Sequence, residues 1–171
     1  MDIFSHGLYG GVTVGRGSKQ SYWTAFFFGV FPDVFAFGIP ISHLLFSLLS
    51  GGNAEIFHSP EDSHASIPSY VFSLYNISHS LIIFILIFGL VWFFRKKPFW
   101  EMSAWGLHIV VDIFTHSEKF FPTPFLWPVS DFYVNGHSWG SPEVFIPNVL
   151  CLAILYGAWW HQRKKVRMQR T

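Results

Sequence analysis

The chain has 171 residues, of which 51% are hydrophobic, 20% aromatic and only 12% charged, whereas roughly 25% of the residues in an ordinary soluble domain are charged. Its net charge of +1 is uninformative about nucleic acid, but no basic-aromatic groove pattern appears, so no nucleic-acid partner is expected. The composition predicts one integral-membrane domain over residues 1–171. Cys151 is the one cysteine, which excludes an internal disulfide.

The chain begins with nineteen residues that are too few to cross a membrane. Gly7, Gly11 and Gly15 recur there at four-residue intervals. Such spacing favours a short packed or re-entrant segment whose backbone lies close to another helix. The alternative is a flexible glycine-rich tail.

Four apolar segments follow, and each is expected to form a membrane-spanning helix of an all-α, polytopic bundle. They cover residues 22–49, which Pro32 and Pro40 are expected to interrupt, then 70–94, 99–114 and 144–160. Lysine and arginine concentrate before the first segment, between the second and third, and after the fourth. This asymmetry predicts that both termini lie in the cytoplasm, most simply at a bacterial inner membrane.

Ionisable side chains inside such segments are the main functional signal, because each costs about 3 kcal/mol or more unless it is compensated. His108 and Asp112, four residues apart, share one helical face. Carboxylates and imidazoles are the usual ligands of zinc, manganese and iron, and a cation would offset buried carboxylate charge. We therefore predict a site for one or two divalent ions, zinc or alternatively manganese, held by His6, Asp33, His79, His108 and Asp112.

Other polar residues are predicted to support this site. Asn76 and Thr115 are expected to hydrogen-bond to the ligands, and His116 and Asp131 are candidates for a general acid or base. Without a metal, the same His and Asp residues would serve as hydrogen-bonding partners between helices, with Asp33 capping a helix after a proline. The histidines expected to be solvated or to lie at an interface are His43, His58, His64 and His161.

Several short motifs also occur in a characteristic order. They are Ser5-His6 through Gly10, Pro32-Asp33, Ser78-His79-Ser80, His108 through Asp112 to Thr115, and Pro128 to Asp131. In these motifs the chain resembles the YdjM-like family of integral-membrane proteins, which are classed as metal-dependent hydrolases. The resemblance implies the same five metal ligands and a distant likeness to helical zinc-dependent phospholipases C and nucleases.

The expected activity is hydrolysis of a phosphoester of a membrane lipid or lipid-linked molecule, with water activated by the metal. One alternative is a metal or proton transporter that uses the same His/Asp cluster and opens toward both faces of the membrane. Another is a structural subunit whose polar residues join helices. The sequence identifies no protein partner.

Overall fold

The computed structural model describes residues 1–51 and 67–168. Both ranges are helical, and no β-strand occurs within them. His58 and His64 lie outside the described residues, so their assignment to a solvated loop stays a prediction. In chain order the elements are α1 (Ile3–Thr13), α2 (Lys19–Leu49), α4 (Ser69–Ser78), α5 (Leu81–Arg95), the 3-10 helix η1 (Trp100–Met102), α6 (Ser103–Thr115) and α7 (Pro142–Met168).

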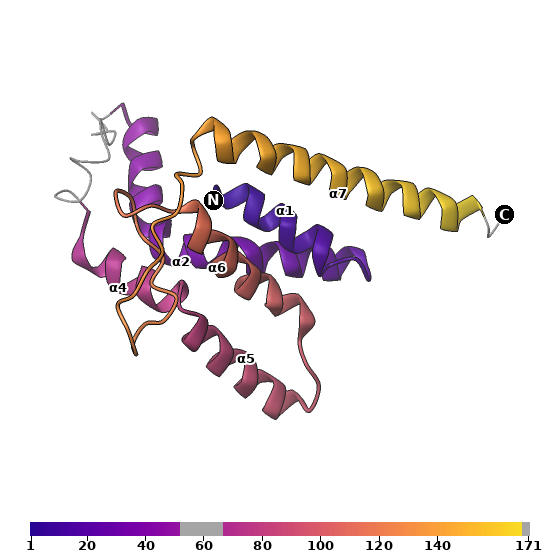
Figure 1. The fold of residues 1–171 in the computed structure, drawn as a ribbon, viewed down its shortest axis with the longest axis horizontal. Coiled ribbons are helices and arrows are strands. Elements are labelled where there is room, and N and C mark those ends of the chain that lie inside the picture. Colours follow the sequence, from indigo (N-terminus) through magenta and orange to yellow (C-terminus); the bar gives the residue numbers. More distant parts are fainter. Residues whose placement is uncertain (52–66, 169–171) are drawn as a thin grey trace.

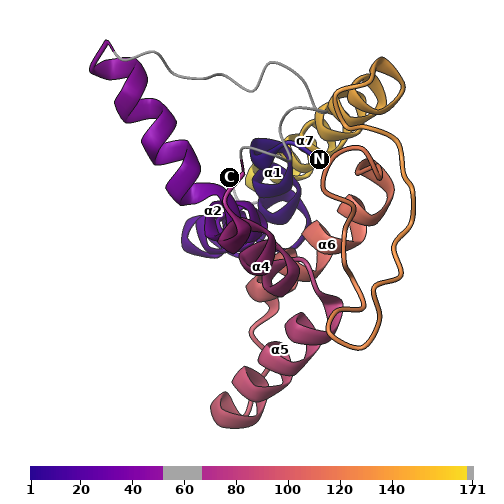
Figure 2. The ribbon, with the colours of Figure 1, turned by 90° about the vertical axis from the view of Figure 1, so that its left-hand side faces the viewer.

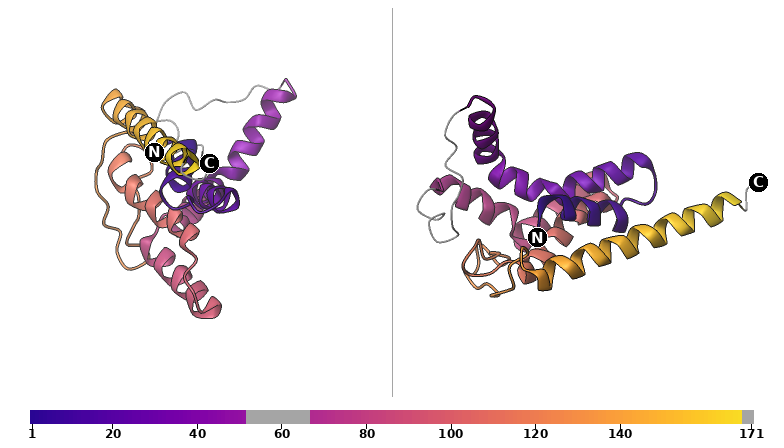
Figure 3. Two further views of the ribbon diagram at one scale, coloured as in Figure 1. Left: turned by 90° about the vertical axis from the view of Figure 1, so that its right-hand side faces the viewer. Right: turned by 90° about the horizontal axis from the view of Figure 1, so that it is seen from above.

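Helix α1 lies in the middle of the bundle and packs against α2, α6 and α7 (Figure 1). Figure 2 shows that α5 and the last turns of α2 project away from this centre. Figure 3 shows α7 running beside α1 and then continuing beyond it. Polar contacts tie these two helices together, because Tyr156 donates to the Leu8 carbonyl oxygen at 3.0 Å and Asn148 donates to Ser5 Oγ at 2.9 Å.

Glycines allow α1 to pack so closely. A Cβ atom added at Gly29 of α2 would lie 2.4 Å from the His6 carbonyl oxygen, inside any normal contact distance. Added Cβ atoms would also come within 3 Å of their neighbours at the three glycines noted in the sequence, Gly7, Gly11 and Gly15. The N-terminal segment is therefore a packed helix, as one of the two sequence interpretations predicted, and residues 3–13 do not form a flexible tail.

We expect Gly29→Ala to destabilise the protein by about 1–3 kcal/mol, because the new methyl group overpacks the contact between α1 and α2. Gly89 of α5 is the matched control, since a Cβ atom there meets nothing within 4 Å. Gly89→Ala should leave stability unchanged or raise it slightly. Thermal unfolding followed by circular dichroism in detergent would measure both, and equal melting temperatures would contradict the packing argument.

Among the described residues, fewer helices are long and apolar enough to span a membrane than the four that the sequence predicted. Helix α2 and residues Pro142–Lys165 of α7 are long and apolar enough to cross a membrane, and α4 with α5 would make a third span if this pair, bent by 56°, is counted as one. The predicted span at 99–114 is divided instead between η1 and the 13-residue α6, which is shorter than the about 20 residues a spanning helix needs. Four spans are thus not confirmed.

Helix interruptions also differ from the prediction. Helix α2 continues through Pro32 and Pro40, and its last turns only bend away from the rest (Figure 3), as interior prolines commonly cause. The second apolar segment breaks instead after His79. Ser80 there is extended and its hydroxyl accepts a hydrogen bond from the Ile83 N–H at 3.2 Å, so it caps the start of α5.

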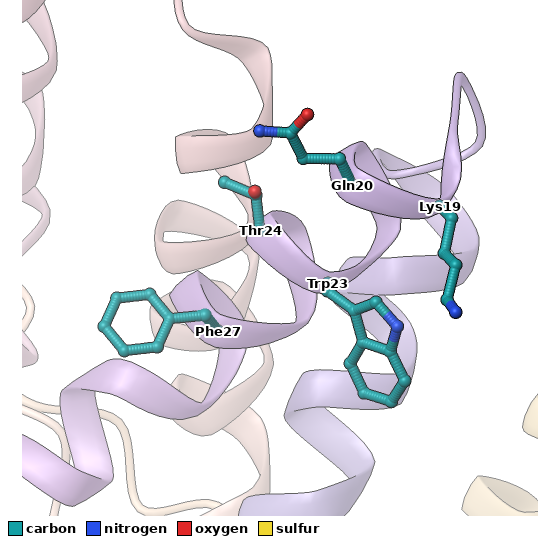
Figure 4. Close-up of a pocket in the computed structure, with 5 residues that line it drawn as sticks. All are labelled: Lys19, Gln20, Trp23, Thr24 and Phe27. Carbon is teal, nitrogen blue, oxygen red and sulfur yellow. The ribbon is translucent and has the colours of Figure 1, made fainter.

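The outer surface is apolar, as expected for a protein in lipid. Large hydrophobic side chains are exposed along α5 and α7, including Phe93, Ile154 and Trp160. Figure 4 shows a pocket on the first turns of α2 that contains no carboxylate or imidazole; its lining is Lys19, Gln20, Trp23, Thr24 and Phe27. Lysine beside tryptophan is typical of the end of a membrane helix, so we read this pocket as interfacial surface.

Candidate metal centre

The five predicted ligands meet at the centre of the bundle, although they come from separate segments. His6 lies on α1, Asp33 on α2, His79 at the end of α4, and His108 and Asp112 on α6. Each is at most 5% exposed. The structure therefore brings together side chains up to 106 positions apart, from His6 to Asp112, in an interior where isolated charges are costly.

Four of these residues direct one atom each at a common point. Asp33, His79, His108 and Asp112 form a buried group that could hold a metal ion. His108 Nε2 lies 3.0 Å from His79 Nε2 and 3.2 Å from Asp112 Oδ2. Asp33 Oδ1 lies 3.5 Å from His79 Nε2 and 3.8 Å from His108 Nε2, and the distance from His79 Nε2 to Asp112 Oδ2 is 3.6 Å. Zinc bonds of 2.0–2.1 Å in tetrahedral geometry place ligand atoms about 3.3 Å apart. These donor atoms fit that requirement.

Backbone carbonyls contact the Nδ1 atoms of the two histidines of this group. His108 Nδ1 lies 2.7 Å from the Gly29 carbonyl oxygen, and His79 Nδ1 lies 3.2 Å from the Tyr75 carbonyl oxygen. A carbonyl only accepts, so the neutral His108 ring carries its proton on Nδ1 and a lone pair on Nε2. The Tyr75 carbonyl favours the same tautomer for His79, although Ser78 Oγ, 2.9 Å from His79 Nδ1, can either donate or accept. Two Nε2 atoms 3.0 Å apart, beside two carboxylates, could share a proton or hold a metal ion between them.

Asp112 presents its second oxygen to another pair of imidazoles. His6 Nε2 lies 2.9 Å and His116 Nε2 lies 3.6 Å from Asp112 Oδ1. Neither Nε2 atom has a hydrogen-bond partner among the described residues. The Met1 amino group contacts the same Oδ1 atom, and Thr115 Oγ1 donates to it at 3.2 Å.

Both of these additional imidazoles are neutral near pH 7. Burial lowers the pKa of His6 to about 4 and the pKa of His116 to about 4, and the attraction of Asp112 offsets this only in part. His116 Nδ1 lies 2.9 Å from the Phe121 carbonyl oxygen, which again leaves the lone pair on Nε2. Neutral imidazole is the form that binds metals.

Only some of the residues predicted to support the cluster contact it in the structure. Thr115 contacts Asp112 as expected, whereas no hydrogen bond joins Asn76 to the cluster among the described residues; Tyr75 and Ser78 support His79 instead. Asp131 is exposed, and no ion pair links it to the described cluster. Of the two candidates for a general acid or base, only His116 lies at the site.

A cavity of about 520 Å³ adjoins the cluster. Asp33 and His116 form part of its wall, and most of the other lining side chains are apolar. The cavity is therefore a place where a molecule could reach the cluster. Its remaining lining residues are Met1, Asp2, Ile3, Phe4, Phe37, Pro40, Ile41, Leu44, Ile67, Pro68, Val71, Phe120, Phe121 and Trp139.

Comparisons of the chain with protein-family models, curated proteins and solved structures find no match. The functional interpretation therefore depends on the geometry of these residues.

Proposed function

We propose that the protein is a membrane-embedded, metal-dependent hydrolase of the YdjM-like family that cleaves a phosphoester of a lipid or lipid-linked molecule. The observation that supports it is the buried group of Asp33, His79, His108 and Asp112, whose donor atoms fit a four-coordinate cation. The mixed carboxylate and imidazole set favours zinc, with manganese as the alternative. A divalent ion in such a site supplies Lewis-acid activation of water and of a phosphoryl oxygen.

Within the chain, we propose that Asp33 moves a proton. Its Oδ1 atom faces the two histidines, at 3.5 Å from His79 Nε2 and 3.8 Å from His108 Nε2, while its Oδ2 atom is buried without a hydrogen-bond partner. Asp33 also lines the cavity. Oδ2 would accept the proton released when water attacks phosphorus and would then return it to the leaving oxygen as its bond to phosphorus breaks.

The Oδ1 side of Asp112 supports a second ion. His6 and His116 would complete it, and three protein ligands leave one position open, as in catalytic zinc sites. In this arrangement Asp112 bridges the two positions, and His116 is a ligand instead of a general acid or base. The Met1 amino group contacts the same oxygen. The alternative to a second metal ion is therefore that the positive charge at this oxygen is the N-terminal ammonium group of Met1.

Metal stoichiometry decides between these explanations. We expect two ions per chain in the purified protein and one in His116→Ala, because the other four-residue group stays intact. His43 is exposed on α2, so His43→Ala should retain two. Elemental analysis would measure all three, and a single ion in the unaltered protein would exclude the second position without affecting the first.

We also propose that both termini lie on the cytoplasmic side, which requires an even number of crossings. The basic residues after the fourth apolar segment, beginning with Arg163, support this orientation. When fused after Thr171, a reporter enzyme that is active only in the cytoplasm should be active, and one that is active only in the periplasm should be inactive. Activity of a periplasmic reporter at this position would contradict the cytoplasmic C-terminus and, with a cytoplasmic N-terminus, would mean an odd number of crossings, such as the three spans formed by α2, α7 and the bent pair.

The activity is tested with the purified protein in detergent, supplied with zinc or manganese and with alkyl or polyprenyl phosphoesters. Release of phosphate or headgroup is the expected result. Tightly bound metal without turnover of any phosphoester would contradict the hydrolase and favour the transporter.

A further inference from the structure

We infer that the apolar cavity beside the cluster binds the hydrocarbon chain of an amphiphilic phosphoester, with the charged head of that molecule at the proposed metal site, which Asp33 and His116 border. This inference rests on the proposed function and adds where the substrate lies and which chemical class it belongs to. The occupant has one alkyl or prenyl chain in the cavity and one phosphate at its inner end.

The walls of the cavity suit such a chain. They come from the start of α1, the middle of α2, residues 67–71 and the segment after α6. The volume of about 520 Å³ lies within the roughly 300–1,000 Å³ range of small-molecule sites. Phe37 and Val71 from two of these walls also belong to one hydrophobic core cluster, so this part of the wall is firmly packed.

Two buried polar side chains of the cluster form part of the cavity wall. Asp33 is 5% and His116 is 6% exposed, and Asp33 Oδ2 and His116 Nε2 have no hydrogen-bond partner among the residues described. A wholly apolar occupant would leave these atoms unpaired, and a wholly polar one would bury its own polar groups against apolar walls. An amphiphile with a single phosphate head suits both the apolar walls and the polar atoms: a phosphate hydroxyl can donate to one of these two acceptor atoms, and the proposed metal ion would hold the ionised phosphate oxygens.

Exposed apolar side chains mark the route into the cavity. Phe4 is 74% exposed, and Ile41 and Phe120 are each 37% exposed, although all three line the cavity. A chain already dissolved in lipid would therefore enter without crossing a polar barrier. The substrate would reach the cluster from the membrane and not from water.

The test uses dodecyl phosphate with a photoreactive diazirine at the end of its chain, added to the full-length protein in detergent. Labelled peptides are identified by mass spectrometry. We expect labelling of residues 37–44 of α2 or of residues 67–71, and we expect an excess of unlabelled dodecyl phosphate to suppress it. Labelling of the lipid-facing surfaces of α5 and α7 should not respond to this competitor.

Adjacent residues of α2 provide a matched pair of variants. Leu44 lines the cavity, whereas Leu45 does not and is 54% exposed. Leu44→Trp should reduce the competed labelling about tenfold, as expected when two buried methylenes of the chain are displaced. Leu45→Trp should leave it unchanged, which also controls for the effect of tryptophan on folding.

The outcomes separate the inference from the proposed function. Competed labelling of the cavity without hydrolysis would support the chain site and contradict the hydrolase. Hydrolysis of dodecyl phosphate with labelling only on lipid-facing surfaces would overturn the chain site and retain the hydrolase. Equal competed labelling in the two tryptophan variants would also overturn the chain site.

Discussion

Replacing Asp112 by asparagine is expected to remove bound metal and hydrolysis together. Asp112 is the one residue whose two oxygens face both sides of the cluster: Oδ2 lies 3.2 Å from His108 Nε2, and Oδ1 lies 2.9 Å from His6 Nε2. Loss of a residue that only supports a ligand typically costs 10–100-fold in metal affinity. Loss of the carboxylate itself should cost at least ~100-fold, because it removes charge from every ion in the site.

The Asp112→Asn variant keeps the size of the side chain, so any loss can be assigned to its charge. Glu118 is the matched control, because it is an exposed carboxylate close to α6 in sequence, and Glu118→Gln should retain full metal content. Elemental analysis and phosphoester hydrolysis would be measured on the same preparations, with circular dichroism to verify folding. Undiminished hydrolysis in folded Asp112→Asn would refute the proposed mechanism.

The members of the cluster were predictable from the sequence, because an apolar segment makes each ionisable residue conspicuous. His79, His108 and Asp112 stand out in this way, and the four-residue spacing of the last two fixed their common face. His6 needed a second signal, the glycines around it, which predicted that its segment would pack closely. In each case the physical reason was local and could be read from neighbouring residues.

Other features depended on contacts that local patterns do not encode. The break after His79 lies in a continuous apolar run, and it is fixed by Ser80 together with the hydrogen bond from the Leu81 N–H to the distant Phe125 carbonyl oxygen at 3.0 Å. The support of His79 by Tyr75 follows from that break. A helix continuing through residue 79 would have favoured Asn76, three positions earlier, as its partner.

The position of His116 agrees with one spacing in the sequence and differs from what its place at the end of an apolar segment predicts. His108, Asp112 and His116 recur every four residues, which predicts one face for all three. His116 follows the last residue of α6, and a residue at the end of an apolar segment is ordinarily expected at the interface. The loop after α6 keeps it buried instead, through the contact between His116 Nδ1 and the Phe121 carbonyl oxygen.

Removal of the metal should destabilise the protein strongly, and the size of the effect should depend on Asp33. A ligand present at ~1,000 times its Kd stabilises the folded state by about 4 kcal/mol, which corresponds to a change in melting temperature of about 10 °C for a chain of this size. Without metal, Asp33 and Asp112 remain buried at 5% and 0% exposure. The charge of these two carboxylates is then no longer offset by a divalent cation in an apolar interior, which is costly.

In Asp33→Asn the chelated protein has one buried carboxylate fewer, so its loss of stability on chelation should be less than half that of the unaltered protein. With metal present, the unaltered protein should have a higher melting temperature than Asp33→Asn. After chelation, the two melting temperatures should be equal, or that of Asp33→Asn should be the higher. Glu101 accepts a hydrogen bond from Ser21 at 2.7 Å away from the cluster, and Glu101→Gln should respond to chelation like the unaltered protein. Thermal unfolding with and without chelator would measure all three. Equal shifts in all of them would show that Asp33 does not face the metal, and no shift in any of them would mean that the cluster is held together by hydrogen bonds between helices.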